Sequence, residues 1–243
     1  KGFLLLTLNG HKDMVFYAEY DPQGKHIATA SGDHTSMIWD AISGKMLFEL
    51  KGHTKPVIFN SFSPDGKKLA TASWDSTVRI WETSTGKLLN TVKGSGTVFW
   101  DSNEKKIVTL VGKEVVVYDA LSGNLTHRLI GHKRSLASAR FNRNGTKVLS
   151  SSWDKTAAIW DLNSDSMICQ FNGHSRELYD AVFSSSEKMV VTVSGDKMVM
   201  VWDAKNGKRI VTLKGHSGSP EKAIFSPDEK NIISGAQDKT IKL

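Results

Sequence analysis

Cysteine is nearly absent from this chain of 243 residues, in which Cys169 is the single thiol. An intramolecular disulfide is therefore excluded, and the composition suits a reducing compartment, so we expect a cytoplasmic protein with the nucleus as the alternative. The apolar runs are short as well, and none approaches the roughly 20 residues that a membrane-spanning helix needs. No segment shows a helical period of apolar residues, which leaves short strands as the expected elements.

Charge of one sign dominates only weakly, since 32 Lys and Arg residues stand against 25 Asp and Glu residues and give a net charge of +7. Such an excess can attract acidic protein surfaces, nucleic acid or anionic lipid. The lysines are spread through turns without forming a basic run, and we interpret most of them as solvated turn residues.

Signals of a catalytic or metal site are missing too. The sequence has no Gly-rich phosphate loop and no unrepeated pair of nucleophile and base. His26, His34 and His127 lie apart in the sequence and show no metal-ligand spacing. We therefore expect no cofactor, no bound metal and no enzymatic activity.

What the sequence does have is an internal repeat. A stretch of 42 residues separates His11 from His53, His132 from His174, and His174 from His216, and each of these histidines follows a glycine. Each repeat ends on an aromatic–acidic pair, at Trp39–Asp40, Trp81–Glu82, Tyr118–Asp119, Trp160–Asp161 and Trp202–Asp203. A fixed period of this length indicates a repeat architecture, and because no stretch looks like a linker we expect one domain over residues 1–243.

The second repeat predicts four short strands, at residues 57–62, 68–73, 77–81 and 88–92. They are rich in β-branched residues and are separated by turn residues such as Ser63–Pro64–Asp65–Gly66. Four strands per repeat, with Gly–His near the start and Trp–Asp near the end, resemble the WD-repeat β-propeller family over essentially residues 3–243. The resemblance implies an all-β propeller of four-stranded antiparallel blades, of which six repeats are visible.

Residues 3–8 have the pattern of a fourth strand, and in the family the first strand of the chain completes the last blade. We therefore expect six blades, the last one closed by residues 3–8. The sequence looks cut from a longer chain at both ends, so a seven-bladed propeller or a longer array is the alternative.

Ser, His, Asp and Trp recur at fixed spacings and invite comparison with a hydrolase triad. We interpret them as structural, because a buried Trp needs an acceptor for its N–H and the family uses such a tetrad of hydrogen-bonded side chains. The expected tetrads are His11, Ser31, Asp33 and Trp39; His53, Ser73, Asp75 and Trp81; His132, Ser152, Asp154 and Trp160; and His174, Ser194, Asp196 and Trp202.

The third repeat departs from the others. Lys93–Gly94–Ser95–Gly96 replaces the Gly–His segment, Tyr118 replaces Trp, and five residues are missing between Trp81 and Tyr118. Drift in a tolerant fold explains this, and a shortened loop that opens a notch beside the third blade is the sharper alternative.

The candidate binding residues belong to loops that the resemblance places on the top face of the propeller. The residue before the tetrad Asp is Trp74 in the second repeat and Trp153 in the fourth, where other repeats have Gly or Gln. Arg134 and Arg176 each lie two residues after a Gly–His, and we expect them to cluster with Trp153. Exposed Trp and Arg are the residues most favoured as interface anchors.

The sequence thus predicts a non-enzymatic scaffold that displays loops to a peptide, helix or loop of another protein in a multiprotein complex. One alternative is a sensor or autoinhibitory module of a larger signalling regulator. Another is a basic propeller that associates with nucleic acid, which would show as steeply salt-dependent binding.

Overall fold

The computed structural model describes residues 4–243, and every regular element in that range is a β-strand. The strands form five four-stranded sheets and one three-stranded sheet, each built from strands that follow one another in the chain. The expected all-β class is confirmed. The chain divides into two compact units, residues 1–111 with 118–126 (unit 1) and residues 112–117 with 127–243 (unit 2).

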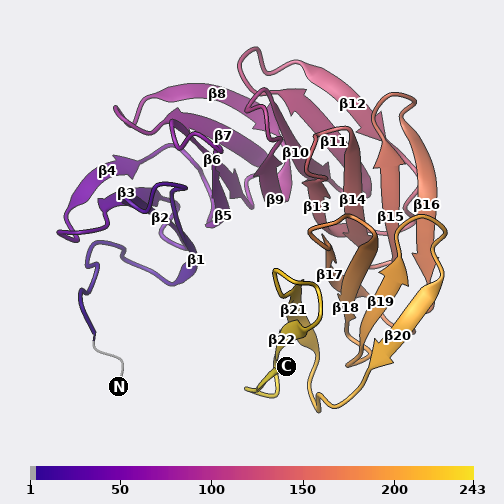
Figure 1. Cartoon of the computed structure of the whole chain (residues 1–243). Helices are drawn as coiled ribbons and strands as arrows, with labels where there is room; N and C mark the ends of the chain where they lie inside the picture. Colours follow the sequence, from indigo (N-terminus) through magenta and orange to yellow (C-terminus); the bar gives the residue numbers. More distant parts are fainter. Residues whose placement is uncertain (1–3) are drawn as a thin grey trace. The chain divides into compact units, whose positions relative to one another are not determined.

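Unit 1 contains the first two sheets (Figure 1). The first sheet consists of β1 (Val15–Tyr20), β2 (His26–Ser31), β3 (Ser36–Asp40) and β4 (Met46–Leu50). The second sheet consists of β5 (Val57–Phe62), β6 (Lys68–Ser73), β7 (Thr77–Glu82) and β8 (Leu88–Lys93). The division between the units falls within the strands of the third sheet, β9 (Ser95–Trp100), β10 (Lys106–Val111), β11 (Glu114–Asp119) and β12 (Leu125–Leu129).

Unit 2 contains the remaining three sheets. They are β13 (Leu136–Phe141), β14 (Lys147–Ser152), β15 (Thr156–Asp161) and β16 (Ser166–Asn172); then β17 (Leu178–Phe183), β18 (Met189–Ser194), β19 (Val199–Asp203) and β20 (Arg209–Leu213); then β21 (Pro220–Phe225), β22 (Ile232–Ala236) and β23 (Ile241–Lys242). The second and third strands of a sheet are the most buried, as in β14 and β15, whereas fourth strands such as β20 are largely exposed.

The turns between first and second strands explain why the repeat keeps Asp, Asn or Ser at the start of the turn. In the first sheet Asp21 Oδ1 accepts the backbone N–H groups of Lys25 and His26, at 2.7 Å and 3.1 Å. Gly24 takes a φ of 68°, a left-handed conformation that costs other L-residues about 1–2 kcal/mol. The same left-handed position is Gly66 or Gly145 in two other turns and Glu104, Glu187 or Glu229 in the remaining three. A fixed acceptor and a residue in this conformation therefore set the register of each hairpin.

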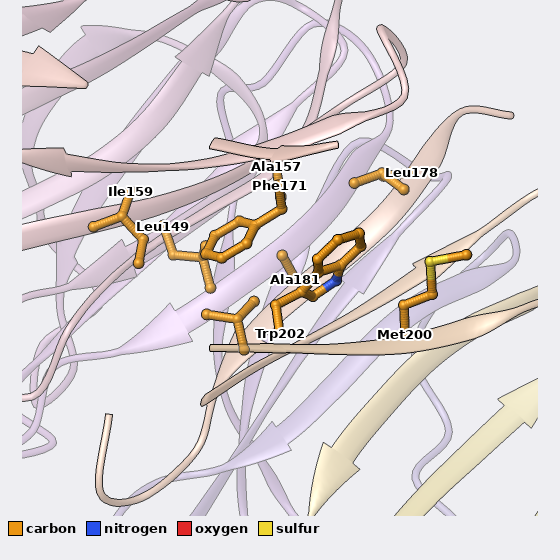
Figure 2. Close-up of a cluster of buried hydrophobic side chains, with 9 residues drawn as sticks. Leu149, Ala157, Ile159, Phe171, Leu178, Ala181, Met200 and Trp202 are labelled. Atoms are coloured by element: carbon orange, nitrogen blue, oxygen red, sulfur yellow. The ribbon is translucent and has the colours of Figure 1, made fainter. Parts of the chain in front are cut away.

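The core lies between neighbouring sheets. In unit 2, Leu149, Ile159 and Phe171 of one sheet pack against Leu178 and Trp202 of the next (Figure 2). The rings of Phe171 and Trp202 lie 5.8 Å apart, centroid to centroid. Burial of one such side chain stabilises the fold by about 1.5–3 kcal/mol. Contacts between the apolar side chains of neighbouring sheets therefore hold the repeats together.

The first strands of the sheets carry different side chains at one shared register in the two units. In unit 1 this position holds Tyr17 and Phe59, whose rings lie 4.3 Å apart. In unit 2 it holds Ser138, Asp180 and Lys222. The buried Asp180 carboxylate accepts hydrogen bonds from the Ser138 hydroxyl at 2.8 Å and from Lys222 Nζ at 2.9 Å.

Arg140, two residues further along β13, completes the charged group in unit 2. Its Nη2 lies 2.6 Å from Asp180 Oδ1. Burial alone would raise the pKa of Asp180, but the charges of Arg140 and Lys222 outweigh this and hold it below its ordinary value. One ionised carboxylate therefore links three neighbouring sheets of unit 2.

The strand expected at residues 3–8 is wrong for residues 4–8, and Phe3 lies outside the described part of the chain. A strand forms by hydrogen bonding to a neighbouring strand, and residues 4–8 belong to no sheet of the described chain. The side chains of Leu6 and Leu8 instead lie against the turn at Gly44. Closure of the sheets by this segment and the number of blades stay predictions.

Candidate interaction site

The expected tetrads lie at one end of their sheets and have a shared geometry. In the second sheet His53 Nδ1 donates to Asp75 Oδ2 over 2.8 Å, and His53 Nε2 accepts from the Thr71 hydroxyl over 2.9 Å. The Trp81 indole N–H donates to the same hydroxyl over 2.9 Å. The chain of hydrogen bonds therefore runs from Trp through a hydroxyl to His and then to Asp, and it places the His proton on Nδ1.

The serines expected in these tetrads are wrong. The hydroxyl that bonds both Trp and His belongs to the residue two positions earlier, which is Thr29, Thr71, Ser150 or Thr192. Ser31, Ser73, Ser152 and Ser194 lie at the end of the same strands, where each donates to a backbone carbonyl and accepts the N–H of the tetrad Asp. Residues two apart share a face of a strand, so spacing alone did not separate the two hydroxyls.

Electrostatics keep the tetrad of the second sheet in one protonation state. Burial would raise the pKa of Asp75, but hydrogen bonds from Thr77, His53 and the Thr54 N–H together lower it to about 2. Burial lowers the pKa of His53, and the neighbouring Asp75 only partly offsets this. Asp75 is thus ionised and His53 neutral near pH 7, in agreement with the hydrogen-bond directions.

The third and sixth repeats show which parts of the tetrad can vary. His216 bonds Asp238 at 3.0 Å and the Ser234 hydroxyl at 2.9 Å, a fifth His–Asp pair. In the third repeat the hydroxyl survives as Thr109, which donates to the Thr97 carbonyl at 2.9 Å because no His follows a glycine there. Ser or Thr stands at the position of Thr71 in all six repeats, whereas two residues later the third and sixth repeats have Val111 and Ala236. This difference is the signal that identifies the tetrad hydroxyl.

The connection into the third repeat is shortened as expected. Gly94 alone separates β8 from β9, whereas residues 51–56 separate β4 from β5. A Cβ on Gly94 would lie 2.4 Å from Cγ2 of Thr109, so the chain can pass this close only as glycine. The predicted notch beside this repeat stays a prediction.

Trp74 lies at an exposed turn tip, with 54% of its surface accessible. Its ring packs against Phe16 of β1, with centroids 5.7 Å apart and the planes inclined by 51°. Phe16 is itself 41% exposed, so the two form an accessible aromatic pair. The sequence reasoning missed Phe16, because its partner comes from the neighbouring repeat and no spacing within one repeat connects them.

Trp153 is 47% exposed and lines a pocket of about 410 Å³ with Arg134, Glu177 and Tyr179. The expected association of Arg134 with Trp153 is therefore found in the structure. Glu177 and Tyr179 were missed. The Tyr179 hydroxyl donates to Glu177 over 3.2 Å, and burial first, then the Glu177 charge, raise the Tyr179 pKa.

Arg176 is not among the residues that line this pocket. Its side chain is exposed, and its backbone carbonyl accepts the hydrogen bond of the Ser194 hydroxyl. The expected clustering of Arg176 with Arg134 and Trp153 therefore stays a prediction. Across residues 4–243 the structure has no group of three His, Cys, Asp or Glu side chains arranged to hold a metal ion.

A family model described as "WD domain, G-beta repeat" (WD40) matches residues 2–40, 44–82, 123–161, 165–203 and 207–243. The chain belongs to the WD40 repeat family. This confirms the resemblance and the β-propeller class with its antiparallel blades, and the unmatched residues 83–122 contain the divergent third repeat. A comparison with curated proteins found no match. Of the described residues, none belongs to a helix that is long and apolar enough to cross a membrane.

Proposed function

We propose that this WD40 chain is a non-enzymatic scaffold that presents the turns at one end of its blades to another protein and thereby assembles or regulates a multiprotein complex. WD40 repeats generally mediate contacts between proteins. The observation that carries the proposal for this chain is Trp153, half exposed at a turn tip in one pocket with Arg134. A large exposed indole beside a guanidinium is the composition that most often anchors an interface.

The pocket offers a partner several kinds of contact. The faces of Trp153 and Tyr179 can take an apolar or aromatic side chain, whereas Arg134 and Glu177 can each pair with a polar group. A peptide, helix or loop brings such a mixture within a few residues. In unit 1, Trp74 with Phe16 gives a second, mainly apolar contact surface at the same end of its sheets.

The state of the tetrads supports a role without catalysis. The His53 side chain is 1% exposed, and the Thr71 hydroxyl that it faces is fully buried and accepts the Trp81 N–H. A nucleophile must reach its substrate, and no surface of Thr71 is accessible to one. The same arrangement occurs in four repeats, which favours a structural role in each.

The test is affinity purification from native extract with three matched baits, followed by mass spectrometry. Wild type is compared with a variant carrying Trp74→Ala and Trp153→Ala, and with Ile42→Ala as control. Ile42 is 85% exposed in a turn at the opposite end of its sheet, so it controls for the loss of exposed apolar surface.

We expect proteins that wild type and Ile42→Ala retain and that the double variant loses while its melting temperature stays within a few degrees of wild type. If all three baits retain the same proteins, the turn aromatics are not the anchors. If the double variant melts as early as a tetrad variant, Trp74 and Trp153 are structural residues and the proposal fails.

A further inference from the structure

In several blades a side chain of the fourth strand contacts a turn of the next blade, and a different residue makes this contact in each case. In the first, second and fourth sheets, the fourth strand places a side chain directly opposite a buried Ile of the third strand. The paired residues are Ile38 and Phe48, Ile80 and Asn90, and Ile159 and Cys169. These side chains occupy one equivalent position, at the end of the sheets away from the tetrads.

At this position the side chain meets a turn of the next blade. A Cβ placed on Gly86 would lie 2.9 Å from Cδ1 of Phe48, and Phe48 also packs on the core cluster below it. Asn90 Nδ2 donates to the Leu121 carbonyl over 3.2 Å. Both residues therefore fill the space between their blades, one with a ring and the other with a hydrogen bond.

Cys169 fills this space least, because a thiol is much smaller than a phenyl ring or an amide. Its Sγ lies 3.1 Å from the Cβ position of Gly207, and beside it a groove of about 610 Å³ opens between the fourth and fifth blades. Ile159, Ile168 and Phe183 provide apolar walls, and Ile168 is 47% exposed. Burial raises the pKa of Cys169, so the thiol is protonated and acts as an apolar wall as well.

The rim of the groove is basic and available. Lys147, Lys188 and Lys205 line it with exposed side chains, and across residues 4–243 no carboxylate lies within ion-pair distance of these three ammonium groups. The two acidic residues of the lining are already engaged by donors. Asp203 Oδ1 accepts the N–H groups of Lys205 and Asn206, and the Glu187 carboxylate accepts the Arg143 N–H and Asn142 Nδ2.

We propose that this groove between the fourth and fifth blades is a second docking site, and that its occupant is a short acidic segment of a protein partner with one large aliphatic side chain. The aliphatic side chain would lie on Cys169, Ile168 and Phe183, and flanking carboxylates would pair with Lys188, Lys205 and Lys147. The site lies at the opposite end of the β14–β15 strands from Trp153, so one partner can be held at each end.

The probe is a synthetic peptide in which one leucine is flanked on both sides by glutamates. It is titrated into the whole chain labelled at the isoleucine methyl groups, and the NMR shifts of Ile159 and Ile168 are followed. Two matched peptides, one with glutamine for every glutamate and one with glycine for leucine, separate the charged from the apolar contribution. An oligouridylate serves as a polyanion without an apolar side chain.

The decisive variant is Cys169→Phe, which places in this groove the residue that the first blade already has at the same register. The Phe48–Gly86 contact shows that the fold accommodates phenylalanine opposite a turn glycine. A variant carrying Lys188→Glu and Lys205→Glu removes the basic rim. Lys67→Glu is its control, because Lys67 occupies the position of Lys188 in the second repeat.

We expect the acidic leucine peptide to shift both isoleucine signals, and Cys169→Phe to weaken its binding at least about tenfold, which corresponds to the loss of one buried aliphatic side chain. The Lys188/Lys205 variant should weaken it similarly and Lys67→Glu should not. The proposal is overturned if neither signal shifts at millimolar peptide, or if the glutamine peptide binds equally well. It is overturned too if the oligouridylate binds wild type as tightly as the acidic leucine peptide does, since general attraction of polyanions would then explain the basic rim.

Discussion

At the scale of single residues, each tetrad depends on one carboxylate. Asp75 accepts the His53 Nδ1–H and the Thr54 N–H with Oδ2, and two further donors of Thr77 with Oδ1. Asp75→Ala should lower the free energy of unfolding by about 1–3 kcal/mol, because the buried His loses its partner. Thermal melting followed by circular dichroism measures this. Asp13→Ala, which removes an exposed carboxylate bonded to the next N–H, should change little, and equal melting of the two variants would contradict a buried tetrad.

The identity of the tetrad hydroxyl gives a second prediction. Thr71→Val keeps the shape of the side chain but leaves the Trp81 indole N–H without its acceptor and His53 Nε2 without its donor. We expect it to destabilise the protein by about 2 kcal/mol or more. Ser73→Ala breaks hydrogen bonds to the Lys55 carbonyl and the Asp75 N–H, and these two residues are less buried than His53 and Trp81, so the loss should cost less. Chemical unfolding that ranks Ser73→Ala as the more costly change would contradict this assignment.

The sequence predicted the His, Asp and Trp of each tetrad but not the hydroxyl. His53, Asp75 and Trp81 are set by repeat spacing, and the structure joins them as expected. Thr71 and Ser73 are both small, both hydroxylated and both on one face of β6. Their roles differ because the indole of Trp81 reaches diagonally across the sheet to the nearer one, and such reach is a property of packing and not of spacing.

The shifted pKa values of two buried histidines and one buried glutamate predict how stability depends on pH. Burial lowers the pKa of His53 and His174 in the folded state below 6.5. Below pH 6.5 the unfolded chain therefore binds protons that the folded chain does not, and stability falls as the pH falls, by up to about 1.4 kcal/mol per pH unit for each histidine. Burial raises the pKa of Glu19 from 4.5 to about 7. Between pH 4.5 and about 7 the Glu19 carboxyl group holds its proton more tightly in the folded chain than in the unfolded chain, so its contribution makes stability rise as the pH falls.

The two contributions oppose each other between about pH 4.5 and 6.5, so wild type should lose less stability on acidification there than the two histidines alone would cause. Glu19→Gln removes the carboxyl group and keeps an acceptor for the Phe62 N–H, which Glu19 binds at 2.6 Å. Denaturant titrations across this range should give a steeper loss of stability on acidification for Glu19→Gln than for wild type. Parallel curves for the two proteins would show that Glu19 titrates normally.

At the scale of strands and turns, glycines with the same backbone angle should differ in sensitivity. Gly24 and Gly86 both have a φ of 68°. A Cβ on Gly24 would meet nothing within 4 Å, whereas one on Gly86 would lie 2.9 Å from Phe48. We expect Gly24→Ala to cost about 1 kcal/mol from backbone strain alone, and Gly86→Ala clearly more. Melting temperatures of the two variants check this, and equal shifts would mean that Phe48 does not press on the turn.

The elements themselves were largely predictable, and the exceptions share a cause. The strands of the second repeat appear close to the expected residues, since short β-branched runs and turn residues act locally. Residues 4–8 have the same local pattern but lie in no sheet of the described residues. Phe16, Glu177 and Tyr179 escaped the sequence reasoning for a related reason, because their importance comes from a neighbouring blade that local patterns do not describe.

At the scale of the whole molecule, the two units use one register in chemically different ways. Tyr17 and Phe59 stack in unit 1, whereas Ser138, Asp180 and Lys222 form a hydrogen-bonded and charged link in unit 2. The residues that build one blade recur in every repeat. The side chain at the shared position of the first strand instead contacts the next blade, and any complementary pair of side chains can make this contact. An aromatic contact in one unit and an ionic contact in the other can therefore occupy the same position without changing the blades.

This difference predicts that stability can be lowered in one unit at a time. Asp180→Ala removes the carboxylate that bonds Arg140, Lys222 and Ser138, and we expect a loss of about 3 kcal/mol, the usual result of breaking a buried ion pair. Hydrogen exchange followed by mass spectrometry should then quicken in β13, β17 and β21 and not in β1 and β5. Phe59→Ala should give the converse pattern, because it removes the ring that stacks on Tyr17. If both variants quicken exchange equally in all five strands, the units unfold as one and the two linkages do not act locally.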